Sequence, residues 1–558
     1  MQKNKQLVIL ILIVAAFLRL WGLERGDAAT DEVLYAFRAV GMLDFDEAED
    51  QTTPLEWFDG EIPWWTKLSF HDHPPLVFFV QHIFMRIFGE NNFAFRLPSA
   101  LLGIASIYLI YLIGALLYSE TVGLISAAIL ALTVNHIYIS RVGLQESYVI
   151  FFMLLATYFF LKALRRDAYF LWAGIALGLA ALTKYTTFVL VPIFLIYLLF
   201  FRRDYFLNKK LWIGALVALF LFSPVILYNF QLYRAVGHFD FQFSYMFGQN
   251  PEVWQVAPGK DIGILGERIH RYIPALVKAN SWMLLSVFAV SIALFFVLLL
   301  RNIRDTLRKH GFLLISIPLL FLLVLRVGPS YRFLAMLTPF IVFVSALFFA
   351  PIFQKKKTAF VILGLFLLFE AAYSINSQVF YYAKGPPLWA YSLGTRTERY
   401  SGGYNELAEF LEEELKDKRP VQVFEMSYQF LEELHEKAIA KALREKLEPY
   451  SAVFIYDGNV DHMAQLWVLD RLNIYHAWPV VKTEQYMAYA EANGIEDLTN
   501  AGFENYYFIT PTEYVYRRDP ESWTVFGPRF EELLIKKGIT PLSIKNKRGE
   551  EAFRVYKF

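Results

Sequence analysis

Apolar stretches recur along the first two-thirds of the chain, and they constrain its fold more than any other feature. They run from Leu7 to about Tyr373, and each is near the ~20 residues that a helix needs to cross a bilayer. The composition agrees, because 56% of the 558 residues are hydrophobic and the mean hydropathy is +0.38. Soluble chains of ordinary composition are less apolar. The sequence therefore predicts an α-helical polytopic membrane protein.

Charge and cysteine content exclude several classes of function. Lys and Arg number 53 against 52 Asp and Glu, so the total charge indicates no nucleic-acid partner. The chain has no cysteine, which excludes disulfides, thiolate nucleophiles and Cys-ligated metals. At the N-terminus, Lys3 and Lys5 precede an apolar run without a small-residue cleavage site, which predicts an uncleaved first span that starts in the cytoplasm.

The connections between the apolar stretches alternate in character. One set is short and basic: Lys162, Arg165 and Arg166; Arg202, Arg203, Lys209 and Lys210; Arg301, Arg304, Arg308 and Lys309; and Lys355, Lys356 and Lys357. The positive-inside rule places these in the cytoplasm. The other set then faces outward: residues 24–73, 141–146, the neighbourhood of Lys184, 230–281 and 327–332.

The alternation also limits the number of crossings. The stretch 74–89 is short and carries Gln81, His82 and Arg86, so we expect an interfacial helix there. About eleven crossings remain, or thirteen if one pair is missed. Because the N-terminus is predicted to be cytoplasmic, either odd number of crossings places the C-terminus on the outer side of the plasma membrane.

After about Lys384 the sequence becomes charged and turn-rich. Its periodicity predicts strands at 452–456 and 506–510 and helices at 405–418, 483–492 and 529–537, the last of them before residues 552–558. We therefore expect two domains: a membrane catalytic domain at 1–383, with its first outer loop at 24–73, and an extracytoplasmic α/β domain at 384–558.

The first outer loop is acidic. Asp31 and Glu32 closely follow the first span, and Thr30 or Asp31 could cap a helix that carries Tyr35 and Arg38. A pure capping role for these carboxylates stays open, as does simple solvation of the acidic run 44–50.

Two histidines flank an acid in His71-Asp72-His73, just before Pro74-Pro75. The first proline holds His73 in an extended conformation where the interfacial helix begins. Asp72 and His73 could bind a divalent metal, although a structural role is equally compatible with this motif.

Further charges belong to the same outer face: Arg141, Glu146, Lys184 and Arg332, the last preceded by Tyr331. Charges at membrane depth are costly and usually line a polar cavity, although Lys184 and Arg332 could also extend to the interface. Transfer at a phosphate-linked group needs a carboxylate to accept a proton and cations to stabilise the leaving phosphate. This outer face carries both kinds of group.

In type and order, these motifs resemble those of the GT-C glycosyltransferases, specifically the protein O-mannosyltransferase and lipid A aminoarabinose transferase (ArnT-like) group. The matching elements cover the N-terminal two-thirds: Arg19-Leu20, Asp31-Glu32 with Tyr35-Ala36, Pro74-Pro75-Leu76, 95–100, Ser140-Arg141 with Glu146, Leu182-Thr183-Lys184, and Tyr331-Arg332 with Pro339. Three positions depart from the group's usual residues. Leu34 and His73 stand where basic residues are common, which weakens a lipid A assignment, and Glu146 stands where Asp is frequent.

The resemblance implies a GT-C fold and a hexosyl- or pentosyltransferase that inverts the anomeric carbon and takes its sugar from a polyprenyl-phosphate donor. Asp31 would be the general base, with Glu32 and Glu146 as the other catalytic carboxylates. The donor phosphate would be bound by Lys184, Arg332, Arg141, His73 and Tyr331. The resemblance also makes a divalent metal conceivable at Asp72 or His73 with His238 or His270.

Several alternatives remain at this level. The hydroxyl acceptor could be a lipid, a polysaccharide or a protein. A transporter or flippase of a lipid-linked substrate would also need many spans and buried cations, but no internal repeats stand out. A non-catalytic assembly protein would not require the acids of the first loop.

Overall fold

The computed structural model describes residues 2–28, 30–45, 52–254, 262–353, 357–396, 401–495, 499 and 501–558. Asp46, Glu47, Glu49 and Asp50 of the acidic run, and Lys355 and Lys356 of the last basic connection, lie outside the described residues. The chain divides into two compact units. The first comprises Met1–Glu24, Glu49–Thr52 and Trp64–Thr397, and the second comprises Arg25–Ala48, Thr53–Pro63 and Glu398–Phe558.

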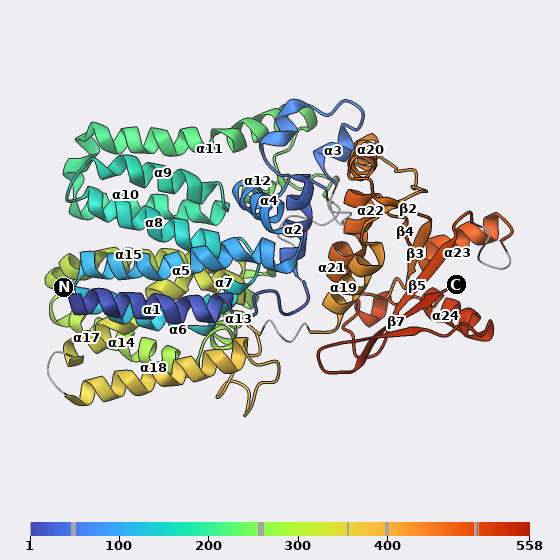
Figure 1. The fold of residues 1–558 in the computed structure, drawn as a ribbon. Coiled ribbons are helices and arrows are strands. Elements are labelled where there is room, and N and C mark those ends of the chain that lie inside the picture. The colour runs from blue at the N-terminus through green and yellow to red at the C-terminus, as the bar shows by residue number, and fades with distance from the viewer. Residues whose placement is uncertain are drawn as a thin grey trace. The chain divides into compact units, whose positions relative to one another are not determined.

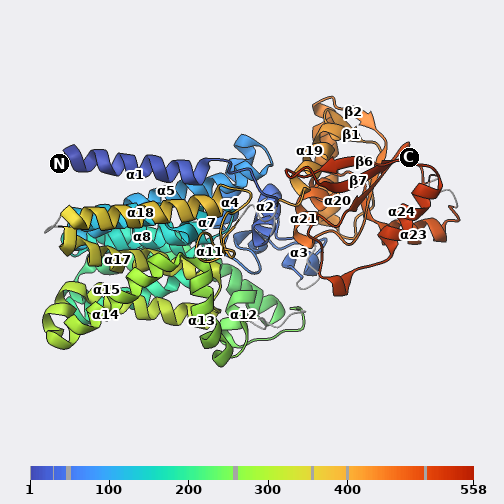
Figure 2. The ribbon, with the colours of Figure 1, turned by 90° about the horizontal axis from the view of Figure 1, so that it is seen from below.

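The first unit is built of helices that lie side by side (Figures 1 and 2). Its described elements are α1 (Gln2–Leu20), η1 (Trp64–Leu68), α4 (Leu76–Phe88), α5 (Asn92–Leu117), α6 (Glu120–Leu132), α7 (Val134–Arg141), α8 (Glu146–Ala163), α9 (Tyr169–Ala181), η2 (Tyr185–Val189), α10 (Leu190–Phe201), η3 (Arg203–Leu207), α11 (Lys209–Val236), α12 (Phe241–Phe247), α13 (Leu265–Ala279), α14 (Trp282–Arg301), α15 (Ile303–Val327), α16 (Tyr331–Leu334), η5 (Ala335–Leu337), α17 (Thr338–Phe353) and α18 (Lys357–Gln378).

Seven described helices are long and apolar enough to cross a membrane, or eight if the bent pair α6 and α7 forms one span. Shorter apolar helices occur at Leu76–Phe88, Tyr169–Ala181 and Tyr185–Phe201. The fold class expected from the sequence, a polytopic helical membrane protein, is confirmed. The exact number of crossings stays a prediction.

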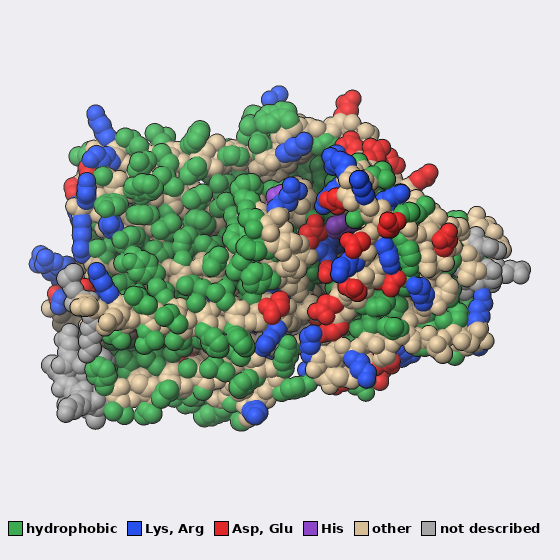
Figure 3. All heavy atoms as spheres, viewed as in Figure 1, with side chains coloured by type: hydrophobic (Ala, Val, Ile, Leu, Met, Phe, Trp, Pro, Cys, Tyr) green, Lys and Arg blue, Asp and Glu red, His purple; other side chains and the backbone are tan. Residues whose placement is uncertain are grey.

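The surface of the helical unit supports the same conclusion. On the face shown in Figure 3, hydrophobic side chains cover the helices, and Lys and Arg gather at the end where the N-terminus lies. Exposed apolar side chains include Phe200 (68%), Phe220 (75%) and Leu300 (85%). Burying such surface in lipid is favourable, whereas water would penalise it.

The second unit is an α/β unit that also contains part of the first loop. Its elements are α2 (Asp31–Gly41), α3 (Pro54–Trp57), α19 (Tyr404–Leu415), β1 (Lys418–Pro420), α20 (Gln429–Arg444), β2 (Glu448–Tyr450), β3 (Ala452–Tyr456), α21 (His462–Gln465), η7 (Leu466–Asp470), α22 (Arg471–His476), β4 (Val480–Lys482), α23 (Thr483–Ala492), β5 (Asn505–Pro511), η8 (Pro520–Ser522), α24 (Phe526–Lys536), β6 (Leu542–Lys545) and β7 (Glu551–Lys557).

A five-stranded sheet of order β4-β3-β5-β7-β6 forms the core of this unit. Strands β3, β4 and β5 are parallel, β7 is antiparallel to β5 and β6, and β1 and β2 form a separate parallel pair. All five residues of β3 are buried, as expected for a parallel strand covered on both faces. One face packs against α23 and α24 through Tyr486, Phe530 and Leu534.

The predicted elements of this region are largely confirmed. The strand at 452–456 is reproduced exactly, and the strand at 506–510 and the helices at 483–492 and 529–537 differ by a few residues at most. Strand β7 was not predicted from the sequence. The helix expected at 405–418 ends at Leu415, and Lys418 already belongs to β1. The domain boundary expected at 383/384 stays a prediction.

Candidate functional site

Three of the predicted site residues of the helical unit meet at one buried carboxylate. Lys184 Nζ lies 2.8 Å from Glu146 Oε1, and Arg332 Nη2 lies 3.4 Å from the same oxygen. The side chain of Glu146 is only 1% exposed, and those of Lys184 and Arg332 are 12% and 15% exposed. Two cations therefore share one carboxylate, so the formal charge of the cluster is +1. We call these three residues the cationic triad.

Breaks in the helices bring the cationic triad together. Glu146 is the first residue of α8. Lys184 is extended between α9 and η2, and the nearby Leu182 carbonyl accepts a hydrogen bond of 3.1 Å from the Leu76 N–H at the start of α4. Arg332 lies in the short helix α16, which Ser330 caps. Helix ends leave backbone groups unpaired and allow polar side chains to converge, which a continuous span would not.

Aromatic and unpaired polar groups surround the cationic triad. Both cations lie over the Phe333 ring, Lys184 Nζ at 4.7 Å and Arg332 Cζ at 5.4 Å. Within the described residues, Glu146 Oε2 and both side-chain polar atoms of Gln145 are buried without a hydrogen bond. Unsatisfied buried polar atoms are rare and often mark a binding or catalytic site.

The other predicted phosphate ligands occupy different environments. Tyr331 also lies in α16, and its ring centroid is 5.6 Å from that of Tyr138. Arg141 donates hydrogen bonds to the carbonyls of Leu18, Trp21 and Gly22, at 3.1, 2.8 and 2.9 Å. These carbonyls lie at and just after the end of α1, so Arg141 has a structural role there. A phosphate-binding role for Arg141 or Tyr331 stays a prediction.

Asp31 and Glu32 form the first turn of α2, in the second unit. Glu32 is 3% exposed. The preceding Thr30 has φ 63° and ψ −169°, and its side chain makes no capping hydrogen bond. A β-branched residue in this region of φ/ψ space is strained, and such strain concentrates at functional sites. The catalytic roles of Asp31 and Glu32 stay predictions.

The His71-Asp72-His73 motif is compact. His73 Nδ1 lies 2.9 Å from Asp72 Oδ2, and His71 Nδ1 lies 4.0 Å from Asp72 Oδ1. Imidazole nitrogen and carboxylate oxygen are ligands that divalent transition metals accept. The donor types at Asp72 and His73 therefore fit the predicted metal, although binding itself stays a prediction.

The two other histidines considered for this metal differ in position. His238 is 6% exposed, and its ring centroid lies 5.2 Å from that of Trp254, which stacks on His71 at 5.8 Å. His270 is exposed on α13. Burial lowers the pKa of His238, so its imidazole stays neutral at pH 7, as metal ligation requires.

Asp240 is a buried acid that the sequence interpretation missed. It accepts hydrogen bonds from Tyr185 Oη (2.7 Å), Asn229 Nδ2 (2.9 Å) and the Phe243 N–H (2.7 Å). Burial raises the pKa of Asp240 to about 6, while these hydrogen bonds oppose the shift. In the sequence, the signal for Asp240 was its position in the loop 230–281, just before a helix rich in aromatic residues. Its contact with Tyr185 could not be predicted there, because it depends on the fold.

Comparisons with known proteins agree with this architecture. Residues 72–228 match the family described as dolichyl-phosphate-mannose-protein mannosyltransferase. The Bacillus subtilis (strain 168) protein named "Putative mannosyltransferase YkcB" is 26% identical over 293 residues, which cover 47% of this chain and 38% of that protein. Another B. subtilis protein, "Putative mannosyltransferase YycA", is 28% identical over 233 residues, covering 41% of this chain and 31% of that protein. The chain thus spans well under half of each curated relative.

A solved structure extends the similarity over the whole fold. ArnT from Cupriavidus metallidurans, in a crystal structure bound to undecaprenyl phosphate, superposes with a TM-score of 0.52 at 13% identity. The superposition covers 99% of this chain and 97% of ArnT. The GT-C fold and the resemblance to this group of transferases are therefore confirmed.

Proposed function

We propose that this chain is an integral membrane glycosyltransferase that moves a sugar from a polyprenyl-phosphate-linked donor to a hydroxyl acceptor. The cationic triad carries the proposal, because it provides a buried site of positive formal charge in a helical membrane unit. The family match over residues 72–228 and the undecaprenyl phosphate bound by ArnT support it further.

The reaction is a single displacement at the anomeric carbon. The acceptor oxygen forms a bond to this carbon while the bond from the carbon to the phosphate oxygen breaks, and the phosphate leaves with the electron pair. One displacement inverts the anomeric configuration. Lys184 and Arg332 stabilise the negative charge of the leaving phosphate. Tyr331 and His73 are the further phosphate ligands in this proposal, whereas Arg141 holds the end of α1 through its hydrogen bonds to the carbonyls there.

The acceptor proton needs a base, and Asp31 has this role in the proposal. Glu32 lies beside it in the first turn of α2, where the helix dipole favours negative charge. Glu146 holds the two cations in position through Oε1. If a divalent metal binds at Asp72 and His73, it would supply further positive charge for the phosphate.

Orientation in the membrane belongs to the same proposal. The basic connections and the N-terminus face the cytoplasm, and the C-terminal domain faces outward. The sugar is then transferred on the outer face of the plasma membrane, as part of building the cell envelope.

Replacing the base tests this assignment directly. Asp31→Asn removes the proton acceptor with little change in volume, so we expect transfer from a matched polyprenyl-phosphate sugar to fall at least about 100-fold. Binding of the donor should be retained. Glu61→Gln, an exposed acid of the same loop, is the control and should keep full activity. Near-normal turnover by Asp31→Asn would falsify the role of Asp31.

Donor binding tests the cations separately. Lys184→Ala or Arg332→Ala should weaken binding of polyprenyl phosphate by about tenfold or more, because each removes a charge-assisted contact. Unchanged affinity in both variants would mean that these residues do not bind the donor phosphate.

A further inference from the structure

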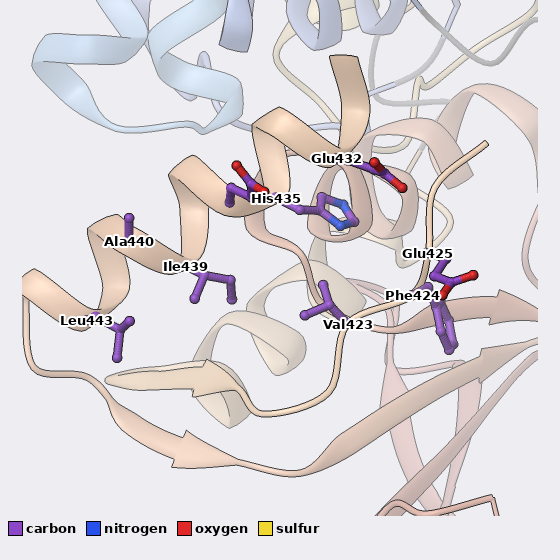
Figure 4. A pocket seen from close by; sticks show the side chains of 9 residues that line it. Val423, Phe424, Glu425, Glu432, His435, Ile439, Ala440 and Leu443 are labelled. Atoms are coloured by element: carbon purple, nitrogen blue, oxygen red, sulfur yellow. The ribbon is translucent and has the colours of Figure 1, made fainter. Parts of the chain in front are cut away.

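A groove in the second unit has properties that the transferase chemistry does not use. It lies between α20 and the segment Val423–Glu425, and its volume is about 500 Å³ (Figure 4). The side chains that line it come from these two elements: Val423, Phe424, Glu425, Glu432, His435, Glu436, Ile439, Ala440 and Leu443.

The floor of the groove is apolar. Leu443 follows Ile439 by four residues and Ala440 by three, so the three side chains lie on one face of α20. Leu443 is 52% exposed and Val423 is 41% exposed. Apolar side chains that remain this accessible around one hollow form a surface that a ligand could bury.

Three of the four polar residues that line the groove are acidic. Glu425, Glu432 and Glu436 are exposed, and none forms an ion pair with another described residue. His435 is buried, and its Nε2 lies 2.8 Å from the Asn473 carbonyl oxygen. With a neutral His435, the formal charge of the lining is −3, and no Lys or Arg lies among its nine residues.

The segment opposite α20 presents free backbone groups. Exposure alternates along residues 421–429, which is the pattern of an extended strand with one face toward the protein. Among the described residues, no hydrogen bond involves the backbone N–H or C=O groups of Val423, Phe424 or Glu425. An unpaired extended segment is a template to which another strand can pair.

We propose that this groove binds an extended polypeptide segment in which apolar residues alternate with Lys or Arg. The segment pairs its backbone with Val423–Glu425, places its apolar side chains over Val423, Ile439 and Leu443, and directs its cations toward the three glutamates. An anionic lipid surface would instead be repelled by these acids, so the charge favours a basic polypeptide. This inference does not depend on the proposed transferase activity.

A short fluorescent peptide of alternating lysine and valine residues tests the inference on the full-length protein in nanodiscs of zwitterionic lipid. We expect saturable binding by fluorescence anisotropy that weakens as the salt concentration rises. A peptide with glutamate in place of lysine should not bind. A lysine–valine peptide with N-methylated backbone should bind at least about tenfold more weakly, because it cannot pair as a strand.

Variants of α20 locate the binding. The double variant Glu432→Lys/Glu436→Lys should weaken binding at least about tenfold, and Leu443→Gln should weaken it about threefold. Glu433→Lys on the same helix is the matched control, because Glu433 does not line the groove and pairs with Lys437. Absence of peptide binding, equal effects of the double variant and the control, or groove-dependent binding of anionic vesicles would each overturn the proposal.

Discussion

At the scale of single residues, Glu146 is the side chain on which the candidate site depends. Its carboxylate is almost fully buried and opposes two cations. Removing one partner from a buried ion group leaves uncompensated charge. We therefore expect Glu146→Gln to lower the free energy of unfolding by about 3 kcal/mol. Thermal unfolding of the purified protein measures this loss.

The same variant separates a donor site from a purely structural ion cluster. In Glu146→Gln the formal charge of the triad rises from +1 to +2, so added polyprenyl phosphate should stabilise this variant more than the wild type. Asp167→Asn, which removes an exposed ion pair with Lys210, is the control and should leave unfolding unchanged. Equal ligand-induced shifts in Glu146→Gln and the wild type would show that the phosphate does not bind at the triad.

Thr30 leads to a second prediction at this scale. Its φ of 63° strains a β-branched residue, and glycine adopts this conformation without a steric cost. Thr30→Gly should therefore raise thermal stability, with a gain of about 1 kcal/mol. If the strain positions Asp31, transfer activity should fall in the same variant. A loss of stability would show that Thr30 is not strained in the native protein.

At the scale of elements, two arginines join α1 to the broken span α6–α7 in a reciprocal way. Arg19 on α1 donates to the carbonyls of Leu130 and Ala131 at the end of α6. Arg141 at the end of α7 donates to carbonyls at the end of α1. Carbonyls at a helix end inside a membrane protein need such donors, since lipid provides none.

This arrangement predicts the phenotype of Arg141→Lys. Lysine cannot reproduce the forked geometry of the guanidinium, so contacts to the α1 carbonyls are lost. We expect the unfolding temperature to fall by several degrees while affinity for polyprenyl phosphate stays within about twofold. The reverse result, weaker phosphate binding at unchanged stability, would support the phosphate-binding role that the motif order implies.

The elements also show what the sequence could predict. Periodicity identified the strand at 452–456, because its residues are uniformly apolar and end at Asp457-Gly458. It did not identify the 61° bend at Thr133, because neither proline nor glycine marks this position. The order of the motifs along the chain indicated Glu146, Lys184 and Arg332 as separate site residues. It did not predict that both cations contact the same oxygen of Glu146, because this contact depends on tertiary packing, which no local pattern encodes.

At the scale of the whole molecule, the distribution of charge along the chain makes the orientation testable. The chain contains no cysteine, so single cysteines can be introduced without first removing native ones. Asp204 lies in the basic connection before α11, where its side chain is 65% exposed. Glu433 is exposed on α20 of the second unit. In the predicted orientation these two positions lie on opposite sides of the membrane.

The positive-inside rule predicts opposite labelling of these two cysteines by a membrane-impermeant maleimide. Glu433→Cys should be labelled in intact cells, whereas Asp204→Cys should be labelled only after permeabilisation. The cysteine-free parent provides the background. Labelling of Asp204→Cys alone in intact cells would place the basic connections outside and the second unit in the cytoplasm. The donor would then have to be used on the cytoplasmic face, which would contradict transfer on the outer face of the membrane.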